Sequence, residues 1–243
     1  MEGRGDFSKL ENVTILIGYH PSRTQKMIEQ IFAGGQVNGQ LVLVTKKEVR
    51  ISDHRVKYIV AESYASDADL MRAGIKNAQK ILVYADDDDQ TLAAGLAVCA
   101  LNTTAHIVAY FDEQHAANLL HKHTGVECVV SPSAEMVIRA LQDPGASGVI
   151  AALVSATDDA TIYSLPVPDG VEVEFGKVFR YLRDRHEATL VAAKRLGEDC
   201  ADLTIGDDEE LQSGSLLFFI AAHRLLEADV QWSEMGAKRV HHN

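Results

Sequence analysis

The sequence predicts an α/β protein with a doubly wound parallel sheet, followed by a helix pair and a small α+β subdomain. Three observations predict this class: short apolar, β-branched runs recur along the first half, helical segments separate them, and the pattern changes after Val130. Strands that alternate with helices form parallel sheets buried on both faces. Ligands of such sheets bind beyond the carboxyl ends of the strands, so a functional site is expected at that edge.

The first domain is predicted from six strands and four helices. The strands are Val13–Ile17, Leu41–Val44, Tyr58–Val60, Ile81–Tyr84, His106–Tyr110 and Glu127–Val130. The helices are Ser22–Phe32, Asp67–Ala73, Gln90–Leu101 and Glu113–Lys122, with Gly34, Gly74 and Gly125 as helix stops. These elements predict a Rossmann-like domain over residues 1–131.

Beyond Pro132, helices are predicted at Ala134–Leu141 and Ala146–Ala156. Proline and glycine in Asp143-Pro144-Gly145 separate them, because both residues interrupt helices. The helices are more apolar than one core face requires, and an isologous dimer would bury the excess. The residues expected at this interface are Met136, Ile138, Leu141, Ile150 and Leu153. The alternative is that the pair, residues 132–157, folds back on its own sheet.

Residues 158–222 are predicted to form the small α+β subdomain. Its strands are expected at Thr161–Val167, Thr189–Lys194, Leu203–Ile205 and Leu216–Ala221, and its helix at Lys177–Arg185. Residues 223–243 form a polar tail that either becomes a helix or frays.

The charge balance argues against a nucleic-acid partner. Lys and Arg number 23 and Asp and Glu 35, which gives a formal net charge of −12, whereas phosphate-binding surfaces are basic. No apolar run approaches the roughly 18 residues that a membrane-spanning helix needs, and residues 1–12 lack a signal peptide's apolar core. A cytoplasmic protein is therefore expected, with Cys99, Cys128 and Cys200 as unpaired thiols.

The turn after the first predicted strand is the expected phosphate site. It reads Gly18-Tyr19-His20-Pro21-Ser22-Arg23 and keeps only the first glycine of G-x-G-x-x-G. The second strand is followed by Thr45, Lys46 and Lys47, with no carboxylate for ribose; the lysines attract phosphate or form a solvated turn. This favours a phosphate-rich mononucleotide over NAD, and the candidates are the adenine nucleotides AMP, ADP and ATP. The expected nucleotide-binding residues are Gly18, Tyr19, His20, Ser22, Arg23, Thr45, Lys46, Ser63 and Ala85.

Four carboxylates, Asp86 to Asp89, follow the fourth predicted strand. They either stabilise the start of the next helix or bind a divalent cation. The sequence contains no G-x-S-x-G, H-E-x-x-H or P-loop motif. We therefore expect a protein that is not an enzyme, with a nucleotide-dependent oxidoreductase as the third hypothesis.

Several segments resemble the RCK family, the regulator of potassium conductance domains of potassium channels and of the Trk and Ktr regulators. They are Val13–His20 (VTILIGYH), Asp69–Ile75 with Ala78–Val83, Cys128–Pro132, Leu165–Gly170, and Leu211–Phe219. These segments extend over the chain from about residue 12 to residue 222. Their order is similar to that of a TrkA-N lobe, crossover helices and a TrkA-C-like subdomain in the family.

The resemblance implies a cytoplasmic ligand-sensing domain that gates a potassium channel, held at the inner membrane through a pore outside this chain. The alternative is a soluble regulatory subunit of a Trk/Ktr-type potassium transporter. Family members pair through the crossover helices and commonly assemble as a gating ring of eight. Calcium-binding positions of one calcium-gated channel align with Ser63, Tyr110 and Asp112, of which only Asp112 is a carboxylate. The candidate metal ligands are Asp112, from this alignment, and Asp86, from the acidic run.

Overall fold

The computed structural model describes residues 5–33, 40–51, 53–155, 160–198, 200–235 and the backbone of 238–239. It divides into two compact units, Met1–Leu141 and Gln142–Asn243, and each is described by itself. The division lies inside the segment 132–157 that was predicted as a helix pair. No helix among the described residues combines the length and apolar character that crossing a membrane would require.

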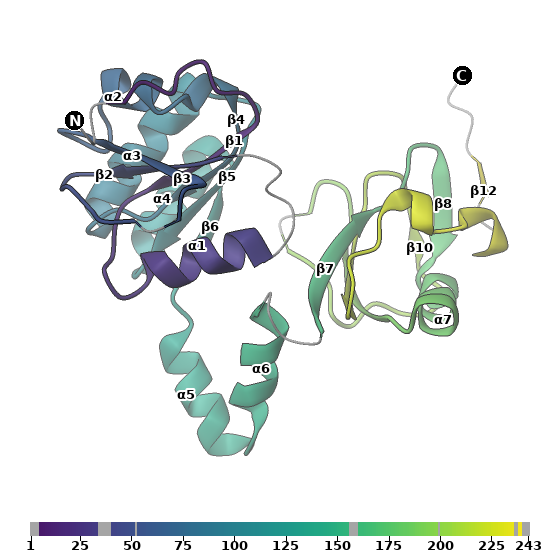
Figure 1. Cartoon of the computed structure of the whole chain (residues 1–243). Coiled ribbons are helices and arrows are strands. Elements are labelled where there is room, and N and C mark those ends of the chain that lie inside the picture. Colours follow the sequence, from purple (N-terminus) through teal and green to yellow (C-terminus); the bar gives the residue numbers. More distant parts are fainter. Residues whose placement is uncertain are drawn as a thin grey trace. The chain divides into compact units, whose positions relative to one another are not determined.

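The first unit is built on a six-stranded parallel sheet with the order β3-β2-β1-β4-β5-β6 (Figure 1). Its strands are β1 (Val13–Ile17), β2 (Leu41–Thr45), β3 (Val56–Val60), β4 (Ala78–Val83), β5 (His106–Phe111) and β6 (Glu127–Val130). Its helices are α1 (Thr24–Ala33), α2 (Asp67–Arg72), the 3-10 turn η1 (Ile75–Asn77), α3 (Asp88–Leu101), α4 (Gln114–Thr124) and α5 (Ser133–Gln142), which reaches the boundary. The predicted Rossmann-like fold is confirmed.

Two apolar cores flank this sheet because alternate strand residues face opposite sides. Leu16, Leu41 and Leu43 pack with Ile28 of α1 on one face. The other face carries the larger core, which takes in residues of α2, α3 and α4. The two cores explain why the strands appear in the sequence as continuous apolar runs.

The predicted helix stops agree with the structure where they are described. Gly74 and Gly125 have φ of 87° and 72°, the left-handed region that ends helices, and Gly34 lies outside the described residues. Each predicted strand of this unit is present. β3 and β4 begin two or three residues earlier than expected, and Tyr84 lies just beyond the end of β4.

The second unit contains helix α6 (Ala146–Val154), two three-stranded sheets and helix α7 (Phe175–His186). One sheet has the order β7-β11-β9 and the other β10-β8-β12. The strands are β7 (Thr161–Pro166), β8 (Val171–Glu174), β9 (Thr189–Lys194), β10 (Glu210–Leu211), β11 (Leu216–Ala221) and β12 (Lys238–Arg239). This arrangement is the predicted small α+β subdomain.

The strand predicted at Leu203–Ile205 is wrong. Asp202 forms a single bridge to Ala193, and its carboxylate then accepts the backbone N–H of Thr204 at 2.8 Å. This turn stops the extended backbone, and Leu203 is 76% exposed. Strands β8, β10 and β12 were not predicted.

The described residues of the polar tail form no α-helix. It contains two short 3-10 turns, η2 (Glu227–Asp229) and η3 (Trp232–Met235), and then β12. Val230 and Met235 enter the core of the second unit, and the backbone N–H of Gln231 donates to the Tyr181 hydroxyl of α7 at 2.9 Å. These contacts anchor the tail to the second unit as far as Met235.

Helices α5 and α6 bury none of their own side chains. On α5, Val137, Ile138 and Leu141 are 68%, 51% and 78% exposed. On α6, Val149 and Val154 are 61% and 74% exposed. Within its own unit neither helix has a fully buried residue, and both the dimer interface and the alternative of a pair folded back on the sheet stay predictions.

Candidate functional site

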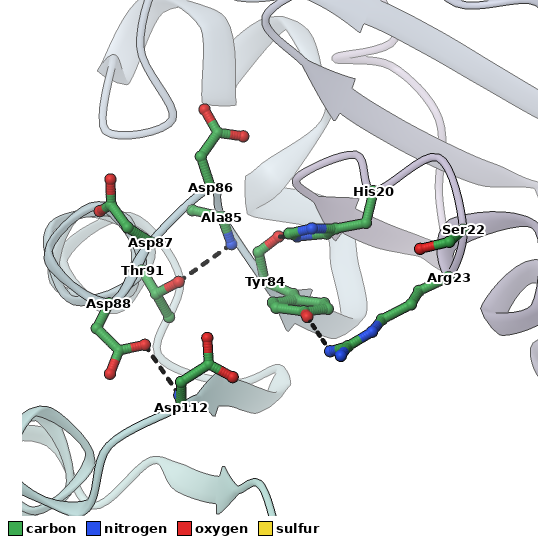
Figure 2. A pocket seen from close by; sticks show the side chains of 10 residues that line it. All are labelled: His20, Ser22, Arg23, Tyr84, Ala85, Asp86, Asp87, Asp88, Thr91 and Asp112. Atoms are coloured by element: carbon green, nitrogen blue, oxygen red, sulfur yellow. Dashed lines mark hydrogen bonds between the residues drawn. The ribbon is translucent and has the colours of Figure 1, made fainter.

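A cavity of about 300 Å³ opens at the carboxyl edge of the first sheet (Figure 2). It is lined by His20, Ser22, Arg23, Tyr84, Ala85, Asp86, Asp87, Asp88, Thr91 and Asp112. β1 pairs with β2 on one side and with β4 on the other, so the strand order reverses here. Such a reversal is the general place for ligands in open α/β sheets.

Gly18 follows β1 with φ of +110°, a conformation that side chains rarely adopt. A Cβ at this position would lie 1.6 Å from the carbonyl oxygen of Tyr84. The Gly18 N–H also donates to the carbonyl of Val44 at 2.9 Å. The one glycine retained in the turn is therefore required by the close approach of two chain segments.

His20 links the turn after β1 to the end of β4 through contacts with Tyr84. Its backbone N–H donates to the hydroxyl of Thr24 at 2.8 Å. Its ring stacks on the Tyr84 ring with centroids 3.8 Å apart, and its Nε2 lies 3.0 Å from the Tyr84 carbonyl oxygen. A side chain thus covers the place where a glycine would leave room for a pyrophosphate.

Arg23 supplies the permanent positive charge of the cavity. Its guanidinium donates to the Tyr84 hydroxyl, and the Tyr110 ring lies 4.4 Å from the Tyr84 ring. Hydrogen bonding to Tyr110, followed by the charge interaction with Tyr84, raises the pKa of Arg23. Arg23 is exposed at the rim, so two aromatic rings orient a cation that solvent, or an anionic ligand, can reach.

The opposite wall is acidic, and two of its carboxylates hold the backbone. Asp87 is the N-cap of α3 and accepts the N–H of Gln90 at 2.8 Å. Asp88 accepts the N–H groups of Asp112 and Glu113, both at 2.9 Å. The helix-stabilising interpretation of the acidic run is therefore confirmed for Asp87, and Asp88 ties together the loops that follow β4 and β5.

Asp86 and Asp112 both line the cavity, as expected of the candidate metal ligands. Asp112 accepts a hydrogen bond from the Tyr110 hydroxyl at 3.3 Å. Across the described part of the chain, no three His, Cys, Asp or Glu residues are grouped so that they could hold a metal ion. The two-carboxylate cation site stays a prediction.

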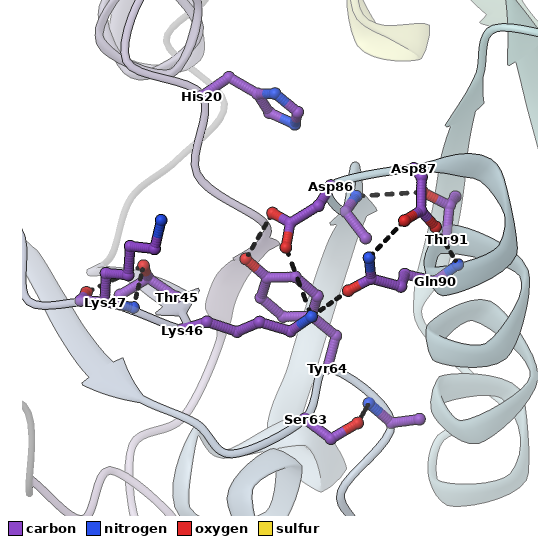
Figure 3. Close-up of polar contacts among 12 residues, drawn as sticks. His20, Thr45, Lys46, Lys47, Ser63, Tyr64, Asp86, Asp87, Gln90 and Thr91 are labelled. Atoms are coloured by element: carbon purple, nitrogen blue, oxygen red, sulfur yellow. Dashed lines mark hydrogen bonds and ion pairs between the residues drawn. The ribbon is translucent and has the colours of Figure 1, made fainter.

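A second polar cluster lies beside the cavity, at the ends of β2, β3 and β4 (Figure 3). The Nζ of Lys46 lies 3.3 Å from Oδ2 of Asp86, bonds the amide oxygen of Gln90 and sits 4.7 Å from the centre of the Tyr64 ring. The Tyr64 hydroxyl lies 3.3 Å from Oδ1 of Asp86. Burial, and next the negative charge of Asp86, raise the pKa of Tyr64, so this phenol stays protonated and donates to the carboxylate.

The structure divides the predicted site residues into two groups. His20, Ser22, Arg23, Ala85, Asp86 and Asp112 line the cavity, whereas Gly18, Tyr19, Thr45, Lys46 and Ser63 do not. Thr45 closes a turn, because its hydroxyl donates to the carbonyl of Lys47 at 3.0 Å. Ser63 accepts the N–H of Ala65 at 3.3 Å.

Four cavity residues were missing from the predicted nucleotide and metal sites: Tyr84, Asp87, Asp88 and Thr91. The sequence places Tyr84 at the end of a predicted strand and the two aspartates within the acidic run. Thr91 accepts the N–H of Ala85 at 3.1 Å and carries no motif of its own. Only the rule that ligands bind beyond strand ends could have identified these residues.

Replacing Asp88 by alanine should lower the free energy of unfolding of the first unit by about 1–2 kcal/mol, because two backbone N–H groups lose their acceptor. Urea unfolding followed by circular dichroism measures this change. Asp89→Ala is the matched control, since Asp89 is the exposed neighbour on the same helix and does not line the cavity. Equal stability of the two variants would contradict the role given to Asp88.

Comparison with known proteins identifies the family of the first unit. A family model of the TrkA-N domain matches residues 15–132. None of the curated proteins matches this sequence. The human SLO3 gating ring shares 14% identity at a TM-score of 0.64, over 87% of this chain and 44% of that chain. The chain thus spans less than half of that relative, and at this identity the similarity concerns the fold.

Two further solved structures are more distant in shape. The GsuK channel bound to NAD has a TM-score of 0.47 and 18% identity, covering 93% of this chain and 38% of that one. The Shewanella denitrificans Kef C-terminal domain in AMP-bound form has a TM-score of 0.45 and 21% identity, covering 58% of this chain and 85% of that one.

The assignment of residues 158–222 to a TrkA-C-like subdomain stays a prediction. The parallel sheet and the match over residues 15–132 show that the first unit of this chain contains an RCK/TrkA-N domain.

Proposed function

We propose that this chain is the ligand-sensing regulatory domain of a potassium channel, in which a nucleotide bound to the first unit controls the opening of the pore. The observation that carries this proposal is the cavity at the strand-order reversal of a TrkA-N domain. Family membership supports a regulatory role in potassium transport. The similarity of fold to a channel gating ring is the reason to place the channel before the transporter.

The cavity favours a mononucleotide. Its volume of about 300 Å³ is at the lower end of small-molecule sites, which span roughly 300–1,000 Å³. His20 covers the glycine position that a dinucleotide site keeps free. Arg23 offers one permanent cation, while four aspartates face the same space. Among AMP, ADP and ATP, the acidic wall favours AMP, and the longer phosphates would need a divalent cation to offset their charge.

A second copy of this chain and a membrane protein are the proposed partners. The exposed apolar residues of α5 and α6 supply a surface for a homodimer, and several dimers would form the proposed ring. The ring acts at the cytoplasmic face of the membrane, on a pore. The alternative partner is the membrane subunit of a Trk/Ktr-type potassium transporter, since a TrkA-N domain suits both systems.

We infer that the domain binds its ligand without chemical turnover. Two of the carboxylates that line the cavity, Asp87 and Asp88, accept backbone hydrogen bonds, and Asp86 is paired with Lys46. A general acid or base needs a group that is free to exchange a proton with substrate. The acidic wall is therefore better suited to positioning than to catalysis.

The proposed function predicts a ligand-dependent rise in melting temperature, because a ligand that binds only the folded state stabilises it by mass action. AMP should give the largest shift, and NAD a smaller one. ADP and ATP should gain affinity when Mg²⁺ is added. Thermal shift and calorimetry on the whole chain measure these effects.

Potassium flux in liposomes tests the regulatory role. The full protein, with its pore or transporter subunit, should change its flux when the nucleotide is added. A potassium flux that stays the same with every nucleotide the protein binds would contradict the proposed gating role. Tighter binding of NAD than of AMP would contradict the mononucleotide site, and turnover of any ligand would restore the enzyme hypothesis.

A further inference from the structure

The residue that normally recognises ribose is missing from its usual place in this fold. In nucleotide-binding sheets of this kind, an acidic residue after the second strand accepts hydrogen bonds from the ribose hydroxyls. Here β2 ends at Thr45 and continues into Lys46 and Lys47. The Thr45 hydroxyl already bonds to the backbone of Lys47. The end of β2 therefore offers no carboxylate of its own.

Asp86 brings a carboxylate to this place from β4. β1 lies between β2 and β4 in the sheet. Lys46, which follows β2, and Asp86, which follows β4, nevertheless meet, with Nζ and Oδ2 3.3 Å apart. The contact therefore bridges the end of β1. Tyr64, which follows β3, reaches the other carboxylate oxygen at 3.3 Å. Figure 3 shows Asp86 with Lys46 and Tyr64 gathered around it.

The carboxylate retains capacity for a ligand. Each of its oxygens makes one long contact, and an ionised carboxylate has about four lone-pair sites. The side chain is 46% exposed, and the same residue lines the cavity beside His20 and Ala85. Asp86 therefore has one side held by Lys46 and Tyr64 and another side open to the cavity.

We propose that Asp86 is the ribose-recognition residue of this domain. From its position after β4, it binds the ribose in place of the carboxylate that usually follows β2. Its two oxygens accept hydrogen bonds from the 2′ and 3′ hydroxyls, while Lys46 and Tyr64 fix its orientation. The ligand class is thereby narrowed to ribonucleotides with a free 2′,3′-diol. This inference rests on the proposed nucleotide site and specifies its selectivity.

The test compares AMP with 2′,3′-dideoxyadenosine 5′-monophosphate by calorimetry on the whole chain. The wild-type protein should bind AMP at least about tenfold more tightly, because hydrogen bonds to a charged acceptor are among the stronger ones. In Asp86→Asn this ratio should fall to about two or less. Asp89→Asn is the matched control and should keep the wild-type ratio, since Asp89 is exposed and does not line the cavity.

The ratio separates recognition from other effects of the substitution. Asp86→Asn also removes the ion-pair partner of Lys46. The freed lysine would change the affinity for AMP and for the dideoxy compound equally, since both carry the same phosphate, and the ratio of the two affinities would stay unchanged. A melting temperature that falls while the ratio persists would make Asp86 a structural ion pair only and would overturn the inference. If neither compound binds to the wild-type protein, the nucleotide site itself fails. If both bind equally to it, the site stands and ribose recognition by Asp86 is wrong.

Discussion

Gly18→Ala should destabilise the first unit by about 3–5 kcal/mol, the largest effect we expect from a single methyl group in this chain. Two effects add. The residue has φ of +110°, which strains any side chain, and the new Cβ would lie 1.6 Å from the Tyr84 carbonyl oxygen, within the distance of a covalent bond. β1 and β4 would have to separate to relieve this clash. Urea unfolding followed by circular dichroism measures the loss.

Gly125→Ala provides the control for backbone strain alone. Gly125 belongs to the same unit and has φ of +72°, but an added Cβ would meet nothing within 4 Å. This variant should lose only about 1 kcal/mol. If the two alanine variants were equally stable, the close approach of Gly18 to Tyr84 would be relieved at little cost, contrary to our expectation.

Leu141→Glu should convert the proposed homodimer into a monomer. Leu141 is 78% exposed at the end of α5, a helix that buries none of its side chains. An isologous interface would contain this residue twice, so each dimer would gain two desolvated carboxylates. We expect the dissociation constant to rise by at least about 100-fold. Sedimentation equilibrium at micromolar concentration measures the change.

Gln142→Glu adds the same charge at the next position, which is polar and exposed, and should leave the dimer largely intact. A monomeric wild-type chain would refute the homodimer. A dimer that tolerates Leu141→Glu would place the interface away from the end of α5.

Strands that consist mostly of apolar residues could be predicted, because their apolar runs are visible without knowledge of their neighbours. β1, β6 and β11 have the predicted bounds. β10 has two residues, too few for any periodic pattern. β8 reads Val-Glu-Val-Glu, an alternation typical of a half-buried strand, and could have been recognised. Leu203–Ile205 is apolar at both ends, yet the hydrogen bond from Thr204 to Asp202 overrides that pattern.

The position of the candidate site could be predicted, but its internal pairing could not. The rule for strand ends correctly leads to the turn that holds His20 and Arg23. Lys46 was expected near the ribose or its phosphate, but its contact with Asp86, 40 positions further along the chain, was not predicted. Such pairing depends on which strands are neighbours, and the local sequence around either residue does not contain that information.

The bond between Asp88 and the loop after β5 also bears on how the cavity would acquire affinity. Because one carboxylate anchors the backbone of both Asp112 and Glu113, the loops that follow β4 and β5 are held as one wall before any ligand arrives. A wall that is already ordered loses little conformational entropy on binding. The turn with His20 and Arg23 is joined to β4 through the carbonyl, ring and hydroxyl of one residue, Tyr84. Adjustment to ligands of different size should therefore fall on that turn, and the acidic wall should serve as the fixed template.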